Sequence, residues 1–154
     1  MARRYARAER GERAVGHVPK NWGDSITLSA GIGLRGLIAP LMLRGSMNGD
    51  IFEAYIEQFV VPVLEPGDIV VLDNLSAHKR ASIRTLLENA GASVIYLPPY
   101  SPDMNPIEMA WSKVKSILRT IAARTIEELE AAIVAALSAI SQTDIANWFR
   151  HCGY

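Results

Sequence analysis

The sequence contains a single cysteine, Cys152, among its 154 residues. This excludes an internal disulfide bond and a zinc site built from cysteines. No apolar run approaches the roughly 20 residues that a membrane-spanning helix needs. The longest run, residues 131–137, lies inside a helical pattern. The arginine-rich start has no apolar segment behind it, which excludes a secretory signal. We therefore expect a soluble intracellular protein.

Net charge is also absent, because 16 basic residues balance 16 acidic ones. A neutral chain speaks against nucleic-acid binding. The charges are nevertheless unevenly distributed. Residues 1–20 carry six basic and two acidic residues, residues 48–76 carry six acidic and no basic ones, and residues 77–124 carry seven basic and three acidic ones. This pattern fits a polyanion-binding protein with an acidic centre, and chance clustering of surface charge explains it equally well.

The hydrophobic fraction of 49% supports a folded core, and the length corresponds to one domain. Residues 1–24 show no periodic pattern, and we interpret them as a basic arm or loop that precedes a core of residues 25–154. Residues 25–34 alternate between apolar and polar positions, which predicts a strand. Residues 37–43 predict its partner in a hairpin, and Pro40 favours an edge position for that partner.

The rest of the chain alternates between helix and strand patterns. We predict a helix over 48–64 capped by Asn48, a strand over 68–73, a helix over 76–90 begun by Ser76 and a strand over 93–97. A rigid proline loop over 98–102 follows. Three more helices are predicted: one opened by Asn105 and Pro106, one begun by a capping box of Thr125 and Glu128, and a short final one around Trp148. This order predicts an α/β fold with helices on both faces of a mixed sheet. Ligands in such sheets bind where the parallel strands end, and Asp73 ends one of them.

Two carboxylates, Asp73 and Glu108, are candidate metal ligands. Asp73 follows four apolar residues and precedes a predicted helix, and Glu108 lies in the first turn of a later one. Magnesium prefers oxygen ligands and usually takes one or two protein carboxylates. The alternative roles are a helix cap for Asp73 and a capping-box partner for Glu108. For His78, which follows Asp73 closely, the alternative is a surface position on a helix.

The strings DNLSAH (residues 73–78) and LPPYSPDMNPIE (residues 97–108) together resemble the DDE transposases of the mariner-like bacterial insertion-sequence type. The 34 residues between Asp73 and Glu108 match the spacing that this family shows between its second and third catalytic carboxylates. Further similar segments are GERAVGHVP near the start, GLIAPLMLRGSMNGDIFEAYIEQFVVPVLEPGD in the middle and WFRHCGY at the end. The resemblance therefore spans nearly the whole chain.

The resemblance implies a ribonuclease-H-like fold and a magnesium-dependent DNA endonuclease, with manganese as a substitute ion. It also implies strand transfer during DNA transposition and integration, with element-end and target DNA as partners, at the nucleoid in the bacterial cytoplasm. Asp73 and Glu108 would bind metal and act in catalysis. The other implied residues are Asn74, His78 and Asn105, which would line the site, and Lys79, Arg80, Lys115 and Arg119, which would contact DNA.

The sequence departs from the family at the first catalytic carboxylate, which should precede the arginine-rich segment. No aspartate precedes Asp24, and neither Asp24 nor Asp50 matches the family pattern. Asp103 belongs to the loop pattern and is interpreted as structural. The strand that carries the first carboxylate should be central in the sheet, and the family's helix-turn-helix region is absent too. We therefore expect an N-terminally truncated catalytic domain that is inactive alone.

Without that central strand, we expect an incomplete sheet, a homodimer or pairing with an upstream transposase segment, or a rearranged pairing of residues 1–24. Two other functions remain open. One is a non-catalytic remnant that binds DNA or pairs with a transposase. The other is a signalling receiver domain, because residues 68–73 resemble a phospho-acceptor strand. Residues 25–34, however, lack the acidic pair that a receiver domain needs.

Overall fold

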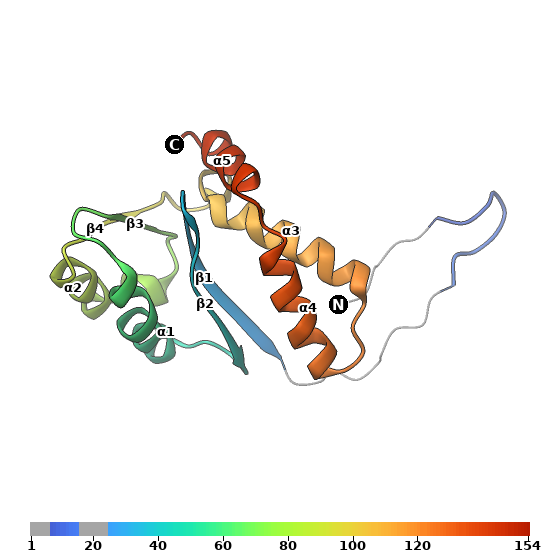
Figure 1. Cartoon of the computed structure of the whole chain (residues 1–154), viewed down its shortest axis with the longest axis horizontal. Coiled ribbons are helices and arrows are strands. Elements are labelled where there is room, and N and C mark those ends of the chain that lie inside the picture. Colours follow the sequence, from blue (N-terminus) through green and yellow to red (C-terminus); the bar gives the residue numbers. More distant parts are fainter. Residues whose placement is uncertain (1–6, 16–24) are drawn as a thin grey trace.

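The computed structural model describes residues 7–15 and 25–154. The strands β1 (Ile26–Gly33) and β2 (Gly36–Arg44) form an antiparallel hairpin that stands between two groups of helices (Figure 1). Residues 7–15 are exposed and form no helix or strand. The predicted arm over residues 1–24 otherwise lies outside the described residues, so it stays a prediction.

The hairpin confirms the two strands that the alternating pattern predicted. Ile26 lies opposite Arg44 at the open end, and Gly33 lies opposite Gly36 at the turn. Gly36 has a φ of +144°, a conformation that a side chain would strain. The register shifts between Ser29 and Gly31, which marks a β-bulge.

A second sheet pairs β3 (Ile69–Leu72) with β4 (Ser93–Tyr96) in parallel. Within residues 7–15 and 25–154, no strand joins this sheet to the hairpin. The single mixed sheet predicted from the element order is therefore two separate two-stranded sheets. This arrangement agrees with the expected incomplete sheet, since both pairs keep an edge that no described strand covers.

The helix predicted over residues 48–64 begins as expected and then changes type. Asn48 caps α1 (Gly49–Tyr55), because its Oδ1 accepts a hydrogen bond of 2.9 Å from the Ile51 amide. The chain continues as the π-helix η1 (Ile56–Val60) and the 3₁₀ helix η2 (Val61–Val63). Pro62 lies in η2 and has no N–H to donate within a helix. The predicted helix is therefore a succession of three helix types.

The helix predicted over residues 76–90 is also broken. It forms a 3₁₀ turn, η3 (Ser76–Lys79), and a separate helix, α2 (Ala81–Asn89). Arg80 lies between them in an extended conformation (φ −62°, ψ 135°), and the Ser76 side chain makes no capping bond. The local 3₁₀ bond from the His78 amide to the Leu75 carbonyl, 3.0 Å, closes the first turn tightly.

Three helices complete the chain: α3 (Pro106–Ile121), α4 (Ile126–Ser138) and α5 (Gln142–His151). Pro106 occupies the first turn of α3, as predicted, but the Asn105 side chain makes no capping bond. The predicted capping box of α4 is confirmed, since Thr125 Oγ1 accepts from the Glu128 amide and Glu128 accepts in return from the Thr125 amide. The helices after Asn105 are therefore set largely by local sequence.

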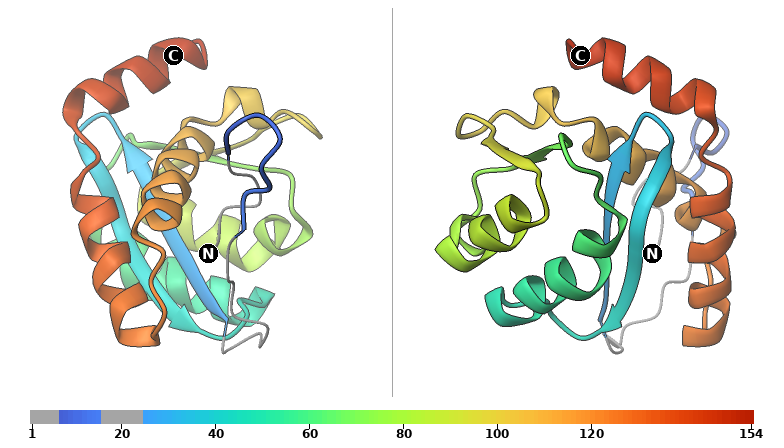
Figure 2. Two further views of the ribbon diagram at one scale, coloured as in Figure 1. Left: turned by 90° about the vertical axis from the view of Figure 1, so that its right-hand side faces the viewer. Right: turned by 60° about the vertical axis from the view of Figure 1, so that its left-hand side comes forward.

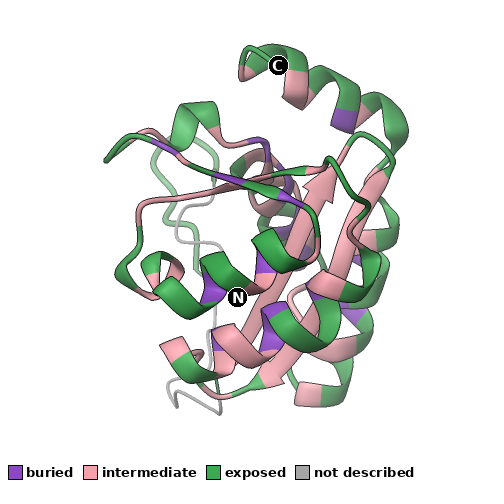
Figure 3. Cartoon of the chain, turned by 90° about the vertical axis from the view of Figure 1, so that its left-hand side faces the viewer, coloured by how far each residue is buried: buried purple, intermediate pink, exposed green. Residues whose placement is uncertain are grey.

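Two groups of helices cover opposite faces of the hairpin (Figure 2). A separate hydrophobic cluster packs on each face. On one face, Ala39 and Leu41 pack against a cluster from α1, η1, α2 and β4. On the other face, Ile26, Leu28 and Met42 pack against a cluster from α3 and α4. The hairpin strands are of intermediate burial, and the fully buried positions lie mainly on the helices around them (Figure 3). Helices thus cover both faces, as the element order predicted.

No single helix among the described residues is long and apolar enough to cross a membrane. The helices α4 and α5 reach the required length and composition only as a pair, and the pair is bent by 73°.

An ion pair joins α5 to α3. Lys113 Nζ lies 2.5 Å from Asp144 Oδ2, and Asp144 also accepts hydrogen bonds from the Ser141 side chain and amide. Lys113 and then Ser141 stabilise the charged form, which lowers the pKa of Asp144 from 3.8 to about 2. The carboxylate therefore stabilises the folded chain above the ordinary pKa, and this stabilisation is lost as pH falls toward 2.

We expect the variant Asp144→Asn to be less stable than the unaltered chain at pH 6, and the difference to shrink between about pH 4 and pH 2. Urea unfolding at several pH values measures this difference. Arg150→Gln, on the same helix, is the control, because arginine does not titrate in this range. A stability difference for Asp144→Asn that stays constant from pH 6 to pH 2 would contradict the assignment.

Candidate active site

The two motifs of the candidate site meet at one edge of the parallel sheet. Leu72 is paired with Tyr96, and the Leu97 amide donates a 2.8 Å hydrogen bond to the Leu72 carbonyl. Since parallel strands end at the same edge, Asp73 and Leu97 leave the sheet side by side. The 3₁₀ turn η4 (Pro102–Met104) then leads the chain into α3.

A pocket of about 400 Å³ lies where these segments converge. One wall is formed by residues 73–75 and another by the proline loop of residues 97–102, and the start of α3 closes it. Four of the predicted site residues line it, namely Asp73, Asn74, Asn105 and Glu108. The fold therefore brings both candidate carboxylates to one cavity although they are far apart in the sequence.

Asp73 is partly exposed and is held by its own loop. Its Oδ1 accepts a 3.0 Å hydrogen bond from the Leu75 amide, and His78 Nδ1 lies 2.5 Å from the same oxygen. The approach does not have hydrogen-bond geometry, and Nδ1 has no hydrogen-bond partner among the described residues. His78 contacts the Asp73 carboxylate but is not among the residues that line the pocket.

His78 is fixed from two further directions. Its ring stacks on Phe52 of α1, with centroids 4.2 Å apart and planes 29° apart. Its carbonyl accepts a 3.3 Å hydrogen bond from the Tyr96 hydroxyl. Only 18% of the His78 side chain is exposed, which differs from the surface helix position that was the alternative for it. The sequence marks Phe52 only as one apolar position of a helix, so its contact with His78 could not be predicted.

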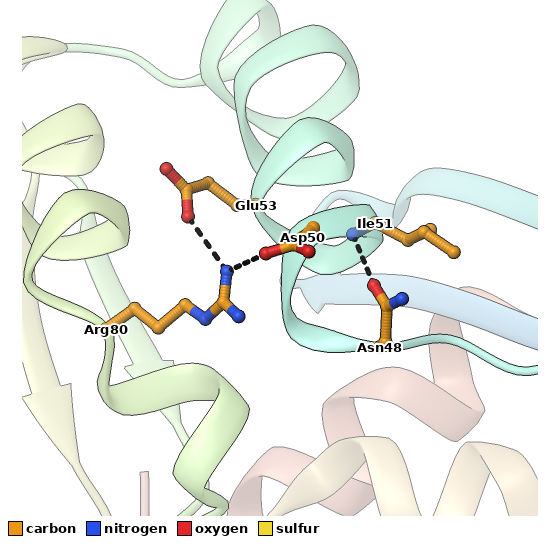
Figure 4. Close-up of polar contacts among 5 residues, drawn as sticks. All are labelled: Asn48, Asp50, Ile51, Glu53 and Arg80. Atoms are coloured by element: carbon orange, nitrogen blue, oxygen red, sulfur yellow. Dashed lines mark hydrogen bonds and ion pairs between the residues drawn. The ribbon is translucent and has the colours of Figure 1, made fainter.

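Arg80 has partners that the sequence did not indicate. Its Nη1 lies 2.5 Å from Asp50 Oδ1 and 3.3 Å from Glu53 Oε2, both on α1 (Figure 4). The hydrogen bond to Asp50 raises the pKa of Arg80 above its ordinary value. The guanidinium also lies over Gly49, where a Cβ atom would come within 2.5 Å of it.

This network anchors the residue that follows η3 to α1. Arg80 thus faces two carboxylates of α1. The DNA contact expected for it stays a prediction. Lys79, beside it in the chain, is exposed.

The remaining basic candidates lie along α3. Glu108, Lys115 and Arg119 are all exposed and recur at helical spacing, so they share one stripe of the helix. At a rise of about 1.5 Å per residue, Lys115 lies about 10 Å along the axis from Glu108. Lys113 is different, because it faces α5 and pairs with Asp144. The stripe therefore leads from the pocket along an exposed basic surface.

The donor set of the pocket suits a hard cation. Asp73 and Glu108 provide two carboxylates, and Asn74 and Asn105 add amide oxygens. One or two carboxylates are what magnesium usually takes from a protein. Among the described residues, no group of three His, Cys, Asp or Glu side chains could hold a metal ion. The residues present thus fit one magnesium ion, whereas a two-metal site needs a further bridging carboxylate.

The family of the chain is shown by its sequence. Residues 1–130 match the model of the family described as DDE superfamily endonuclease, and the chain belongs to this family. The receiver-domain interpretation is therefore wrong. A comparison with curated protein sequences gave no match.

Solved structures of the Mos1 transposase are similar in fold. The Mos1 strand transfer complex has a TM-score of 0.75 at 18% identity, and the match covers 97% of this chain and 45% of that one. The Mos1 paired-end complex with the left transposon end has a TM-score of 0.73 at 18% identity, covering 96% and 46%. The catalytic domain of Mos1 mariner transposase has a TM-score of 0.59 at 16% identity, covering 81% and 66%. The α/β ribonuclease-H-like fold expected from the sequence is therefore confirmed.

The chain spans a little less than half the length of the first two of these structures.

Proposed function

We propose that this chain forms the part of a DDE transposase site that contains the second and third carboxylates, in a transposase of the mariner-like bacterial insertion-sequence type. The observation that carries the proposal is the convergence of Asp73, Asn74, Asn105 and Glu108 on one pocket. The family match supports the reaction class, which is metal-dependent DNA cleavage and strand transfer in transposition. Such a protein acts on chromosomal DNA, at the nucleoid in the bacterial cytoplasm.

Asp73 and Glu108 would hold magnesium, or manganese in its place. Mos1 catalytic-domain structures described as containing Mg and Mn support the choice of ion. The bound metal supplies Lewis-acid stabilisation of the oxygens at the scissile phosphate. His78 keeps the Asp73 carboxylate in place, since its own ring is wedged between Phe52 and that carboxylate. Asn74 and Asn105 orient water or phosphate oxygens at the pocket wall.

The titration of manganese into the chain tests the pocket without any need for catalysis. We expect Asp73→Asn and Glu108→Gln each to weaken manganese binding about tenfold or more, an effect of about 1.4 kcal/mol, because each removes a charged ligand. Electron paramagnetic resonance of free manganese measures the affinity.

Asp103→Asn is the matched control for manganese binding, since Asp103 lies in the same motif but does not line the pocket. Equal manganese affinities of Asp73→Asn, Glu108→Gln and Asp103→Asn would refute the metal assignment. Weaker manganese binding in Asp103→Asn alone would place the metal site at the loop that contains Asp103.

We further propose that the chain does not cleave DNA alone. A two-metal DDE mechanism needs a carboxylate between the metals, and the described residues supply two carboxylates to the pocket. A second polypeptide or a frameshift fusion that adds an upstream strand ending in a carboxylate would complete the site. Such a strand could pair with an edge of the β3–β4 sheet, since no further described strand covers it. One face of this sheet is also open, because Ile69 and Ile95 are 62% and 50% exposed. A homodimer is the other way to cover that face.

Incubation of the isolated chain with end-labelled element-end DNA and magnesium or manganese tests this proposal. We expect uncut DNA on a denaturing gel, because the ligand set is incomplete. Cleavage that disappears in Asp73→Asn would show that the chain is a complete nuclease, and the proposal of inactivity would then be wrong.

A second candidate function is DNA binding or transposase pairing without catalysis. The exposed stripe of Lys115 and Arg119 favours it, because phosphate contacts need only positive charge at the right spacing. The two functions share the DNA contact and differ in the metal site. Manganese binding at Asp73 and Glu108 therefore separates them.

A salt series of DNA-binding measurements tests the shared contact. If Lys115 and Arg119 each contact a phosphate, Lys115→Gln and Arg119→Gln should each reduce the slope of log affinity against log salt by about 0.9. Arg84→Gln is the control, since Arg84 pairs with Glu88 on α2. Slopes that are the same in all three variants would exclude this stripe as the DNA-facing surface.

A further inference from the structure

Tyr100 lies on the rim of the carboxylate pocket and points into solvent. Its exposed fraction is 101%, higher than that of every other large hydrophobic residue in the described part of the chain. It belongs to the pocket lining together with Asp73 and Glu108. No described side chain hydrogen-bonds to its hydroxyl or stacks on its ring. The ring therefore contributes nothing to the folded core.

The backbone of Tyr100 is strained as well. Its φ is +59°, in the left-handed region that residues with a large side chain rarely adopt. The other two such residues that are not glycine have structural explanations. Ala122 ends α3 in the left-handed cap conformation, and Ala39 lies in β2 beside the bulge of the hairpin. Tyr100 ends no helix and lies in no bulge, and strain of this kind concentrates at functional sites.

The surrounding loop restricts the backbone of Tyr100. Pro98 and Pro99 precede Tyr100, Pro102 follows it closely, and Ser101 Oγ donates a 3.4 Å hydrogen bond back to the Pro99 carbonyl. Prolines restrict the backbone, so the loop has few alternative conformations. The loop thus presents an aromatic ring next to two carboxylates, and the loop backbone has little entropy left to lose on binding.

We propose that Tyr100 is a stacking platform for an unpaired base of the DNA strand whose phosphate enters the pocket. This inference rests on the proposed function, because it takes DNA as the ligand of the pocket. An aromatic ring stacks on any base, since every base has a π face. A base inside a duplex has no free face, so the platform selects a single-stranded or opened DNA end.

The experiment uses the full chain and a single-stranded oligonucleotide that contains 2-aminopurine, whose fluorescence falls when an aromatic ring stacks on it. We expect the unaltered chain to bind and to quench this fluorescence. Tyr100→Ala should weaken binding about 5- to 150-fold, the range that one base–aromatic stack provides, and should abolish the quenching. Tyr100→Phe should retain both, because the ring face is preserved.

Met104→Ala is the matched control, since Met104 is an exposed apolar residue in the same motif that does not line the pocket. Thermal unfolding of Tyr100→Ala should match that of the unaltered chain or exceed it, which separates a binding role from a structural one. Binding and quenching by Tyr100→Ala at the level of the unaltered chain would overturn this inference and leave the proposed function standing. A loss in Tyr100→Phe equal to that in Tyr100→Ala would also overturn it. No binding of DNA by the unaltered chain would overturn the proposed function together with it.

Discussion

The parallel pairing of β3 with β4 is the constraint on which the candidate site depends. Its register places Leu72 beside Tyr96, and the next hydrogen bond, from the Leu97 amide to the Leu72 carbonyl, holds the two exits of the sheet together. Asp73 and the proline loop follow directly from these exits. Because side chains alternate along a strand, a slip of one residue would turn neighbouring side chains to the opposite face of the sheet. The four-residue strands therefore determine the geometry of the pocket.

The third wall of the pocket depends on a different part of the fold. Glu108 lies at the start of α3, and α3 packs on the hairpin through the cluster that contains Val114 and Leu118. The parallel sheet packs on the opposite face of the hairpin, through the cluster that contains Phe52 and Ile83. The hairpin thus lies between the helix that carries Glu108 and the sheet that carries Asp73. Both carboxylates are positioned by burial of apolar surface rather than by contacts between themselves.

Polar contacts then refine the position of Asp73. The imidazole of His78 lies against it, Phe52 supports that ring, and Arg80 anchors the same turn to α1. The contacts of Phe52 with His78 and of Arg80 with Asp50 join residues more than twenty positions apart in the sequence. The contact of His78 with Asp73 lies within one loop. The acidic residues Asp50 and Glu53 illustrate this. They lie in the acidic segment of the chain, but they pair with an arginine of the basic segment.

Sequence reasoning succeeded where local forces dominate. The strands of the hairpin, the caps of Asn48 and Thr125, and Pro106 at the start of α3 follow from periodicity and from the needs of helix ends. The two motifs also indicated the pocket residues, because residue type and spacing are properties of the chain. Tertiary contacts decided the rest. The break at Arg80, the stacking of Phe52 on His78 and the separation into two sheets depend on partners distant in the sequence, which no local pattern records. The exposed ring of Tyr100 belongs to this second group, because only the folded loop shows that its neighbours leave it uncovered.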